Sequence, residues 1–298
     1  MAQLNGSLGW IGVADEAVAY GTIGLIGDME YLQGISAKAT FNRNWIDTPT
    51  LGSDAPAIGL ATSTHALLDI VTAHTNVEAD LATLYGVGSA SSSSVYDFAD
   101  PAVDMTSLSA YFDMQGAEWD AVGCMPTKYV WNFSNSGPAT LTTSFICQSM
   151  ALWGGAARTE AVPPASEIVL PAGLTTFTIG GTAVAGVTGG SVTVERKLTG
   201  MERQALGTAI LRQPILDGSS GPSIKITASF NCELDAALGN NTVAEIADIL
   251  SATTSGAVVF STFAIAGAQL IGDIPEAGRG LRTCTLNYNC TGLSVTTT

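Results

Sequence analysis

The side chains that most often carry acid–base or metal chemistry are scarce in this chain and far apart. Only two histidines occur among the 298 residues, His65 and His74. Leucine and valine recur at helical spacing through Thr64–Leu84, which predicts a helix, and a separation of nine residues on a helix corresponds to about 180°. We therefore expect the two imidazoles to point in opposite directions, where they cannot share a metal ion.

Carboxylates offer two further candidate sites. Asp97, Asp100 and Asp104 carry the oxygen ligands that a hard cation prefers, but the cluster lacks the central glycine of a calcium-binding loop. Glu118 and Asp120 have the composition of an acid–base pair. In a strand they would share one face, which is ordinary surface patterning. A solvated loop and a strand surface are therefore the favoured interpretations.

The glycines and cysteines also lack the spacing of a known site. Gly21, Gly24 and Gly27 resemble a phosphate-binding loop only superficially, since no long helix follows them, and a turn-rich connection is favoured. The odd cysteine count and the absence of a secretory signal favour reduced, mostly buried thiols, with a single disulfide as the alternative. The five cysteines are Cys124, Cys147, Cys232, Cys284 and Cys290. We predict no catalytic residue, no cofactor and no metal site.

The elements that must position these residues are mostly strands. Two-residue alternation, rich in threonine, valine, isoleucine and aromatic residues, predicts a mainly β fold. The alternating segments are the hairpin Thr127–Met150 and the strands Ser191–Lys197, Ser223–Leu234, Ala257–Ala264, Ala268–Ile271 and Leu281–Leu293. Besides Thr64–Leu84, the sequence predicts a helix at Asn241–Leu250 and a helical turn at Met201–Leu206 that ends at Gly207. We expect Ser223–Leu234 and Leu281–Leu293 to form the core sheet.

Charge is low and unevenly distributed. The chain is 46% hydrophobic and 12% charged, with 26 acidic and 11 basic residues and a formal net charge of −15. Residues 1–126 carry 15 acids and two bases, whereas residues 127–298 carry 11 acids and nine bases. Such a charge balance argues against a surface that binds nucleic acid and against docking on anionic lipid. The uncharged stretches Ile168–Val194 and Ser251–Gly272 are interrupted by glycine and threonine, so we predict no membrane span.

Several segments resemble the tail tube proteins (major tail proteins) of siphovirus-type bacteriophages. Residues 116–150, GAEWDAVGCMPTKYVWNFSNSGPATLTTSFICQSM, are similar to the lead strand and hairpin of that family. From Gly190 onward the order of strand, short turn, variable stretch and strand is also similar, followed by a helix, a strand and a closing hairpin. The opening at Val18–Thr22 fits the same pattern. The resemblance covers about two thirds of the chain by order of elements, and residues 49–113 have no counterpart in it.

The resemblance implies a single domain over residues 1–298, a β-sandwich or partial barrel with one or two short helices. Residues 49–113 would be an inserted or extended-loop region. Identical subunits would close into hexameric rings and stack into a tube in the virion, after assembly in the cytoplasm of the host bacterium. Other tail proteins (tape measure, terminator and tail tip) would be partners, and viral DNA would pass through without specific binding. Acidic residues of the first 126 are available to line the bore, since a lining of lysine or arginine would hold phosphates.

Two other classes of protein fit part of the pattern. Another β-rich virion protein, such as a tail terminator, a baseplate module or a capsid decoration, would have similar strands. A carbohydrate-binding or hydrolytic β-sandwich would use exposed aromatic rings, and the candidates are Trp45, Trp119, Trp131 and Trp153. The resemblance favours the structural role over enzymatic activity. It also leads us to expect inter-subunit contacts from the hairpin Thr127–Met150 and from residues 49–113.

Overall fold

The computed structural model describes residues 11–16, 20–21, 30–32, 34–48, 58–74, 95–99, 107–114, 117–154, 177–179, 182–183, 186–199, 213–219, 221–234, 258–260, 263–271 and 282–296. All regular secondary structure in these ranges is β-strand, and the paired strands are antiparallel, which confirms the predicted mainly β class. The predicted helix at Asn241–Leu250 and the turn at Met201–Leu206 lie outside the described residues.

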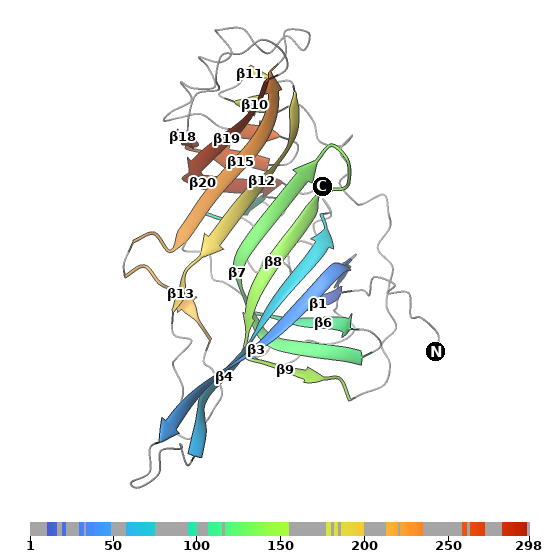
Figure 1. The fold of residues 1–298 in the computed structure, drawn as a ribbon, viewed down its shortest axis with the longest axis vertical. Coiled ribbons are helices and arrows are strands. Elements are labelled where there is room, and N and C mark those ends of the chain that lie inside the picture. Colours follow the sequence, from blue (N-terminus) through green and yellow to red (C-terminus); the bar gives the residue numbers. More distant parts are fainter. Residues whose placement is uncertain are drawn as a thin grey trace, which may run out of the picture.

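The largest sheet has twelve strands and is organised around one long strand, β7 (Ala117–Ser134). The first part of β7 pairs with β6 (Leu108–Met114) and β9 (Ser149–Leu152), and the second part pairs with β8 (Thr140–Cys147) and β12 (Val187–Arg196). Beyond β12 lie β15 (Ile224–Leu234), β19 (Arg282–Cys290) and β18 (Gln269–Ile271). Beyond β8 lie β4 (Ile58–Ala73) and β3 (Gly34–Thr48), and beyond β6 lie β1 (Ile11–Asp15) and β2 (Glu30–Leu32). Figure 1 shows the two parts of β7 running in different directions.

The change of partners along β7 occurs where the chain departs from regular strand geometry. Gly123 has a φ of 62°, a left-handed conformation that glycine adopts without steric cost. The register with β8 then shifts between Pro126 and Lys128, and proline in a sheet is usually found at such a bulge. The sequence Gly123–Lys128 therefore allows one strand to serve two differently directed sets of neighbours.

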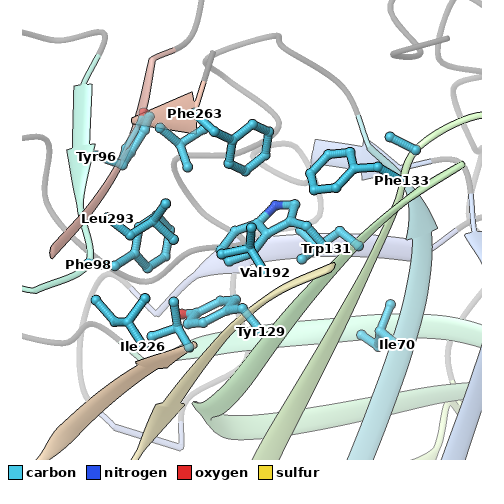
Figure 2. Close-up of a cluster of buried hydrophobic side chains, with 14 of the residues drawn as sticks. Ile70, Tyr96, Phe98, Tyr129, Trp131, Phe133, Val192, Ile226, Phe263 and Leu293 are labelled. Carbon is cyan, nitrogen blue, oxygen red and sulfur yellow. The ribbon is translucent and has the colours of Figure 1, made fainter. Parts of the chain in front are cut away.

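A second sheet of six strands covers one face of the first. Its order is β11 (Thr182–Ala183), β10 (Thr178–Ile179), β16 (Val258–Phe260), β17 (Phe263–Ala266), β20 (Gly292–Thr296) and β5 (Val95–Asp97). Aromatic rings join the two sheets: the ring centroid of Trp131 lies 5.3 Å from that of Phe98 and 5.7 Å from that of Phe263 (Figure 2). A separate pair of short strands, β13 (Leu198–Thr199) and β14 (Ile215–Leu216), follows β12. The sheets face each other across an aromatic core, as in a β-sandwich.

Most of the predicted strands are confirmed. The hairpin Thr127–Met150 corresponds to the second part of β7 with β8, and Ser223–Leu234 corresponds to β15, which pairs with β19 in the large sheet as expected. The prediction of one strand over Leu281–Leu293 was wrong in one respect. The chain turns at Thr291, so that β19 ends in the large sheet and β20 begins in the second sheet.

The predicted helix at Thr64–Leu84 was wrong for the residues that are described. Residues up to Ala73 belong to β4, which pairs with β3 on one side and β8 on the other. Ala66, Leu68 and Ile70 are buried while the residues between them are less buried, a period of two rather than 3.6. The mixed leucine and valine spacing was compatible with both periods, and pairing on both edges favoured the strand. Residues 75–84 lie outside the described ranges.

Candidate assembly surfaces

The face of the large sheet that points away from the core is built from small polar side chains. Strand register places two uncharged rows across this outer face. One row is Val71, Thr142, Val130, Thr193, Thr227 and Asn289. The other is Thr140, Asn132, Ser191, Ser229 and Asn287. Hydroxyl and amide groups at most of these positions offer hydrogen bonds but no fixed charge, so the two rows form an uncharged band across the outer face.

A third row, at one end of the outer face, carries the charge that the other two lack. It runs through Asp69, Ser144, Lys128, Glu195 and Lys225 on five neighbouring strands. The Nζ atom of Lys128 lies 2.8 Å from Oε1 of Glu195, and both side chains are partly exposed. The hydrogen bond from Lys128 and the nearby charges of Lys128 and Lys225 hold the pKa of Glu195 below its usual value. Positive charge prevails around Glu195.

This charged row borders a pocket of about 430 Å³, which we call the basic pocket. Its lining residues are Thr127, Lys128, Glu195, Arg196, Lys197, Pro222, Ser223 and Lys225. Four of the eleven lysines and arginines of the chain therefore line this one pocket, together with one acid. Lys197 lies at the border with β13 and its Nζ is 3.0 Å from a carboxylate oxygen of Asp217. Hydrogen bonds from Ser219 and then Lys197 lower the pKa of Asp217 to about 2.

Arg196 extends from the basic pocket into the end of the core. Its side chain is buried, its Nη1 donates a hydrogen bond to the hydroxyl of Tyr129 at 3.2 Å, and its guanidinium lies 5.1 Å from the centre of the Tyr129 ring and 5.9 Å from that of Phe98. Burial raises the pKa of Tyr129 to about 12, so the hydroxyl stays neutral at physiological pH. Cation–π contact stabilises the guanidinium without removing its charge.

The carboxylate of Glu16 accepts hydrogen bonds from several groups around the bend of β7. Its two oxygens accept hydrogen bonds from the backbone N–H groups of Gly21 (2.8 Å) and Gly123 (2.6 Å) and from the hydroxyls of Ser107 (2.7 Å) and Ser109 (3.2 Å). Gly21 and Gly123 both have positive φ, and a Cβ atom on either would overlap Gln148. The donors lie as far as 107 residues from Glu16 in sequence, so no local pattern could have predicted this cluster.

Two cysteines meet beside this bend. The Sγ atoms of Cys124 and Cys147 lie 2.9 Å apart and both side chains are fully buried. Burial is the main cause that raises the pKa of the Cys124 thiol well above its usual value. Cys232 is also buried and Cys290 is half-buried, so the prediction of mostly buried thiols holds for the cysteines whose side chains are described. The linear spacing of the cysteines gave no sign that Cys124 and Cys147 are neighbours.

The two histidines lie in different environments. His65 is half-buried on β4, whereas His74 follows β4 and is fully buried, with its ring centroid 5.4 Å from that of Phe263. Burial lowers the pKa of His74 to about 3, and neither ring nitrogen has a hydrogen-bond partner. His74 is therefore a neutral core residue.

The remaining candidate residues are structural where they are described. Asp97 accepts a hydrogen bond from the N–H of Ala99 at 2.9 Å and so closes a turn. Asp100, Asp104, Gly24 and Gly27 lie outside the described residues. Glu118 and Asp120 are half-buried on β7, as strand patterning predicted. Within the described part of the chain, no group of three or more histidine, cysteine or acidic residues is placed to hold a metal ion.

The three tryptophans whose side chains are described do not form an exposed stacking platform for sugars. Trp131 is completely buried in the aromatic core and Trp119 and Trp153 are half-buried, while Trp45 belongs to β3. Within the described ranges, no helix is long and apolar enough to cross a membrane.

Comparison with known protein families identifies a match over most of the chain. The family described as phage tail tube protein matches residues 6–290, which is nearly the whole chain. No curated protein matches the sequence. The match agrees with the mainly β architecture and includes every strand of the large sheet and all strands of the second sheet except β20.

Proposed function

This chain belongs to the phage tail tube proteins and is a structural component of the viral tail, and from that premise we propose that identical copies close into hexameric rings which stack into a siphovirus-type tube that conducts DNA during ejection. The role is structural rather than enzymatic. Assembly in the cytoplasm of the host bacterium belongs to the same proposal.

The outer face of the large sheet is the surface best suited to line the bore, and this observation carries the proposal. Its two central rows contain hydroxyl, amide and valine side chains and no lysine or arginine. A DNA backbone would find no cation on these rows to hold its phosphates. Composition suggested an acidic lining from the first 126 residues. An uncharged lining serves the same end, because both withhold the cations that would retain DNA.

Open sheet edges support association between copies. Strands β18, β2 and β3 each have one neighbour in the large sheet and therefore one edge that no described strand covers. Closing a ring is a common way to cover such edges, and stacking identical rings head to tail generates a filament. No described strand pairs with the backbone groups at these three edges, so strands of another copy can pair with them.

The projecting end of the β3–β4 hairpin is our candidate for contact between rings. From Ala66 onward β4 pairs with both β3 and β8, but residues 58–65 pair with β3 alone. Figure 1 shows this end of the hairpin extending beyond the rest of the sheet. It belongs in part to residues 49–113, where inter-subunit contacts were expected. By contrast, β8 is paired on both sides, which leaves mainly the turn of the β7–β8 hairpin for contacts with neighbours.

The other partners follow from the same architecture. A tape measure protein would occupy the bore before DNA does, and terminator and tail tip proteins would cap the two ends of the stack. No membrane partner is proposed. All of these contacts require at least one complete ring.

Electron microscopy of the purified full-length chain tests the proposal. We expect stacked rings or tubes whose number rises with protein concentration, and a single size class of ring. Monomers at every concentration and temperature would contradict the proposal, and rings that never stack would instead indicate a tail terminator.

The bore assignment has its own test. Thr142→Lys with Thr193→Lys places two cations in one uncharged row, on the two strands that flank β7, and assembled tubes of this variant should retain DNA at low salt, whereas wild-type tubes should not. Ala266→Lys, at an exposed position of β17 in the second sheet, is the control and should behave as wild type. Equal DNA retention by both variants would show that the outer face is not the lining.

A further inference from the structure

The basic pocket is the strongest feature that a smooth, uncharged bore does not explain. The chain has more than twice as many acids as bases, yet four cations surround this one cavity. Gathering like charges costs free energy unless negative charge compensates for it. In the described part of the chain, one acid lines the pocket and a second pairs with a lining lysine.

Among the described residues, acids pair with two of the four cations of the basic pocket. Lys128 pairs with Glu195, and Lys197 pairs with Asp217. Neither Lys225, which is exposed, nor Arg196, which is buried, forms an ion pair with any described residue. Two positive charges therefore remain at the end of the large sheet, one fixed in the core and one free to reach outward.

A segment of the sequence with acids and no bases lies elsewhere on the same sheet. The β6–β7 hairpin carries Asp113, Glu118 and Asp120 and has no lysine or arginine between Leu108 and Met125. Register places Asp113 opposite Glu118. Figure 1 shows β6 and β9 on one flank of the molecule and β13, which adjoins Lys197, on the other. The acidic hairpin and the basic pocket therefore cannot satisfy each other within one subunit.

We propose that the basic pocket of one subunit receives the acidic β6–β7 hairpin of the next subunit in the ring. This inference rests on the proposed ring assembly and identifies one of its contacts. Complementary surfaces on opposite flanks make a head-to-tail contact, and such a contact closes into a ring when each copy is rotated by a fixed angle. Charge complementarity also sets orientation, because a subunit placed in reverse would bring like charges together.

A second copy fits the basic pocket better than DNA does. The subunit has a net charge of −15, and a chain that must bind DNA phosphates needs basic residues distributed along a groove rather than around one pocket. In an assembly of identical copies, in contrast, each subunit supplies one acidic β6–β7 hairpin for every basic pocket.

Two charge-reversed variants test the contact. Variant X, Lys128→Glu with Lys225→Glu, makes the basic pocket acidic, and variant Y, Asp113→Lys with Glu118→Lys, makes the hairpin basic. Each variant alone should need about tenfold more protein than wild type to form rings at about 0.1 M salt, because like charges then meet at every contact. An equimolar mixture of X and Y should assemble near the wild-type concentration, because alternating subunits restore opposite charges at every contact.

The mixture experiment distinguishes loss of this contact from misfolding and from a general loss of assembly. Recovery in the mixture requires that both variants are folded, and a control that adds an acid away from these surfaces, Ala266→Glu at an exposed position of β17 in the second sheet, should assemble alone as wild type does. Rings from X alone or Y alone at the wild-type concentration would overturn the inference while leaving the tube proposal intact. Failure of the mixture to recover, with both variants folded by circular dichroism, would also overturn it. Absence of rings from the wild type would overturn the tube proposal itself.

Discussion

The two faces of the same strands differ in the kind of side chain that they carry. On the second part of β7, Tyr129, Trp131 and Phe133 point into the aromatic core, while Val130 and Asn132 stand in the uncharged rows of the outer face. The inner face is specified by shape, because closely packed rings tolerate little change in volume. The outer face is specified mainly by the absence of charge, which many sequences satisfy. A substitution should therefore have very different effects on neighbouring residues.

Removal of the central indole should have the largest effect. Trp131→Ala removes a completely buried ring that contacts Phe98 and Phe263, and we expect a loss of about 3–5 kcal/mol in the free energy of unfolding. Asn132→Ala, the next residue on the exposed face, should change it by less than about 0.5 kcal/mol. Denaturant unfolding followed by tryptophan fluorescence and circular dichroism measures both. Similar losses for the two variants would show that the outer face also contributes to packing.

The bend of β7 should be the next most sensitive place. Glu16→Ala leaves two hydroxyls and two backbone N–H groups without their acceptor, at an expected cost of about 2–3 kcal/mol. Asp15→Ala is the matched control, because its side chain is exposed on the neighbouring position, and it should have little effect. Hydrogen exchange should also show faster exchange of the Gly21 and Gly123 amides in the Glu16 variant. Unchanged exchange at both glycines would contradict the role assigned to Glu16.

Lowering the pH should reduce the stability of the fold, because His74 is buried in the core. Its pKa is about 3 in the folded protein and near 6.5 in an unfolded chain, so the unfolded state binds more protons between these values. Stability is therefore complete above about pH 6.5 and falls as the pH is lowered toward 3. Between pH 7 and pH 5 we expect His74 to account for a loss of about 2 kcal/mol.

Chemical denaturation of His74→Phe across this pH range measures that contribution. The variant should lose about 2 kcal/mol less than the wild type between pH 7 and pH 5. His65→Gln should retain most of the wild-type pH dependence, because His65 is only partly buried and its pKa is lowered less. Parallel pH profiles for wild type and His74→Phe would refute the assignment.

The sequence predicted the elements that have a clear period and missed those that depend on distant neighbours. Strands such as Ser223–Leu234 were identified because one face is apolar and the other is polar, which is a local signal. The strand β4 was mistaken for a helix because its pairing with β3 and β8 is not visible in its own residues. The turn at Thr291 depends on which sheet each flanking strand joins, which is also non-local.

The functional surfaces were hidden for the same reason. Lys128, Glu195 and Lys225 are separated by 67 and 30 residues in sequence, and only strand register places them in one row. Glu16 accepts a hydrogen bond from the backbone N–H of Gly123, which lies 107 residues later in the sequence. The sulfur atoms of Cys124 and Cys147 approach each other beside the bend of β7. Family resemblance identified the class of protein, but composition could not show that two rows of the outer face are uncharged, because strand register alone brings those residues together.

The smallest predicted effect concerns two adjacent threonines on opposite faces of β8. An increase in stability at the buried threonine alone would be direct evidence that the two faces differ. Thr143 is buried on the inner face and its hydroxyl has no hydrogen-bond partner, whereas Thr142 stands half-exposed in an uncharged row. Thr143→Val keeps the shape and removes an unsatisfied hydroxyl, so it should raise the free energy of unfolding by about 1 kcal/mol. Thr142→Val should change it by less than about 0.5 kcal/mol, because its hydroxyl is open to water. Equal changes at the two positions, measured by denaturant unfolding, would mean that burial does not separate these faces as the structure indicates.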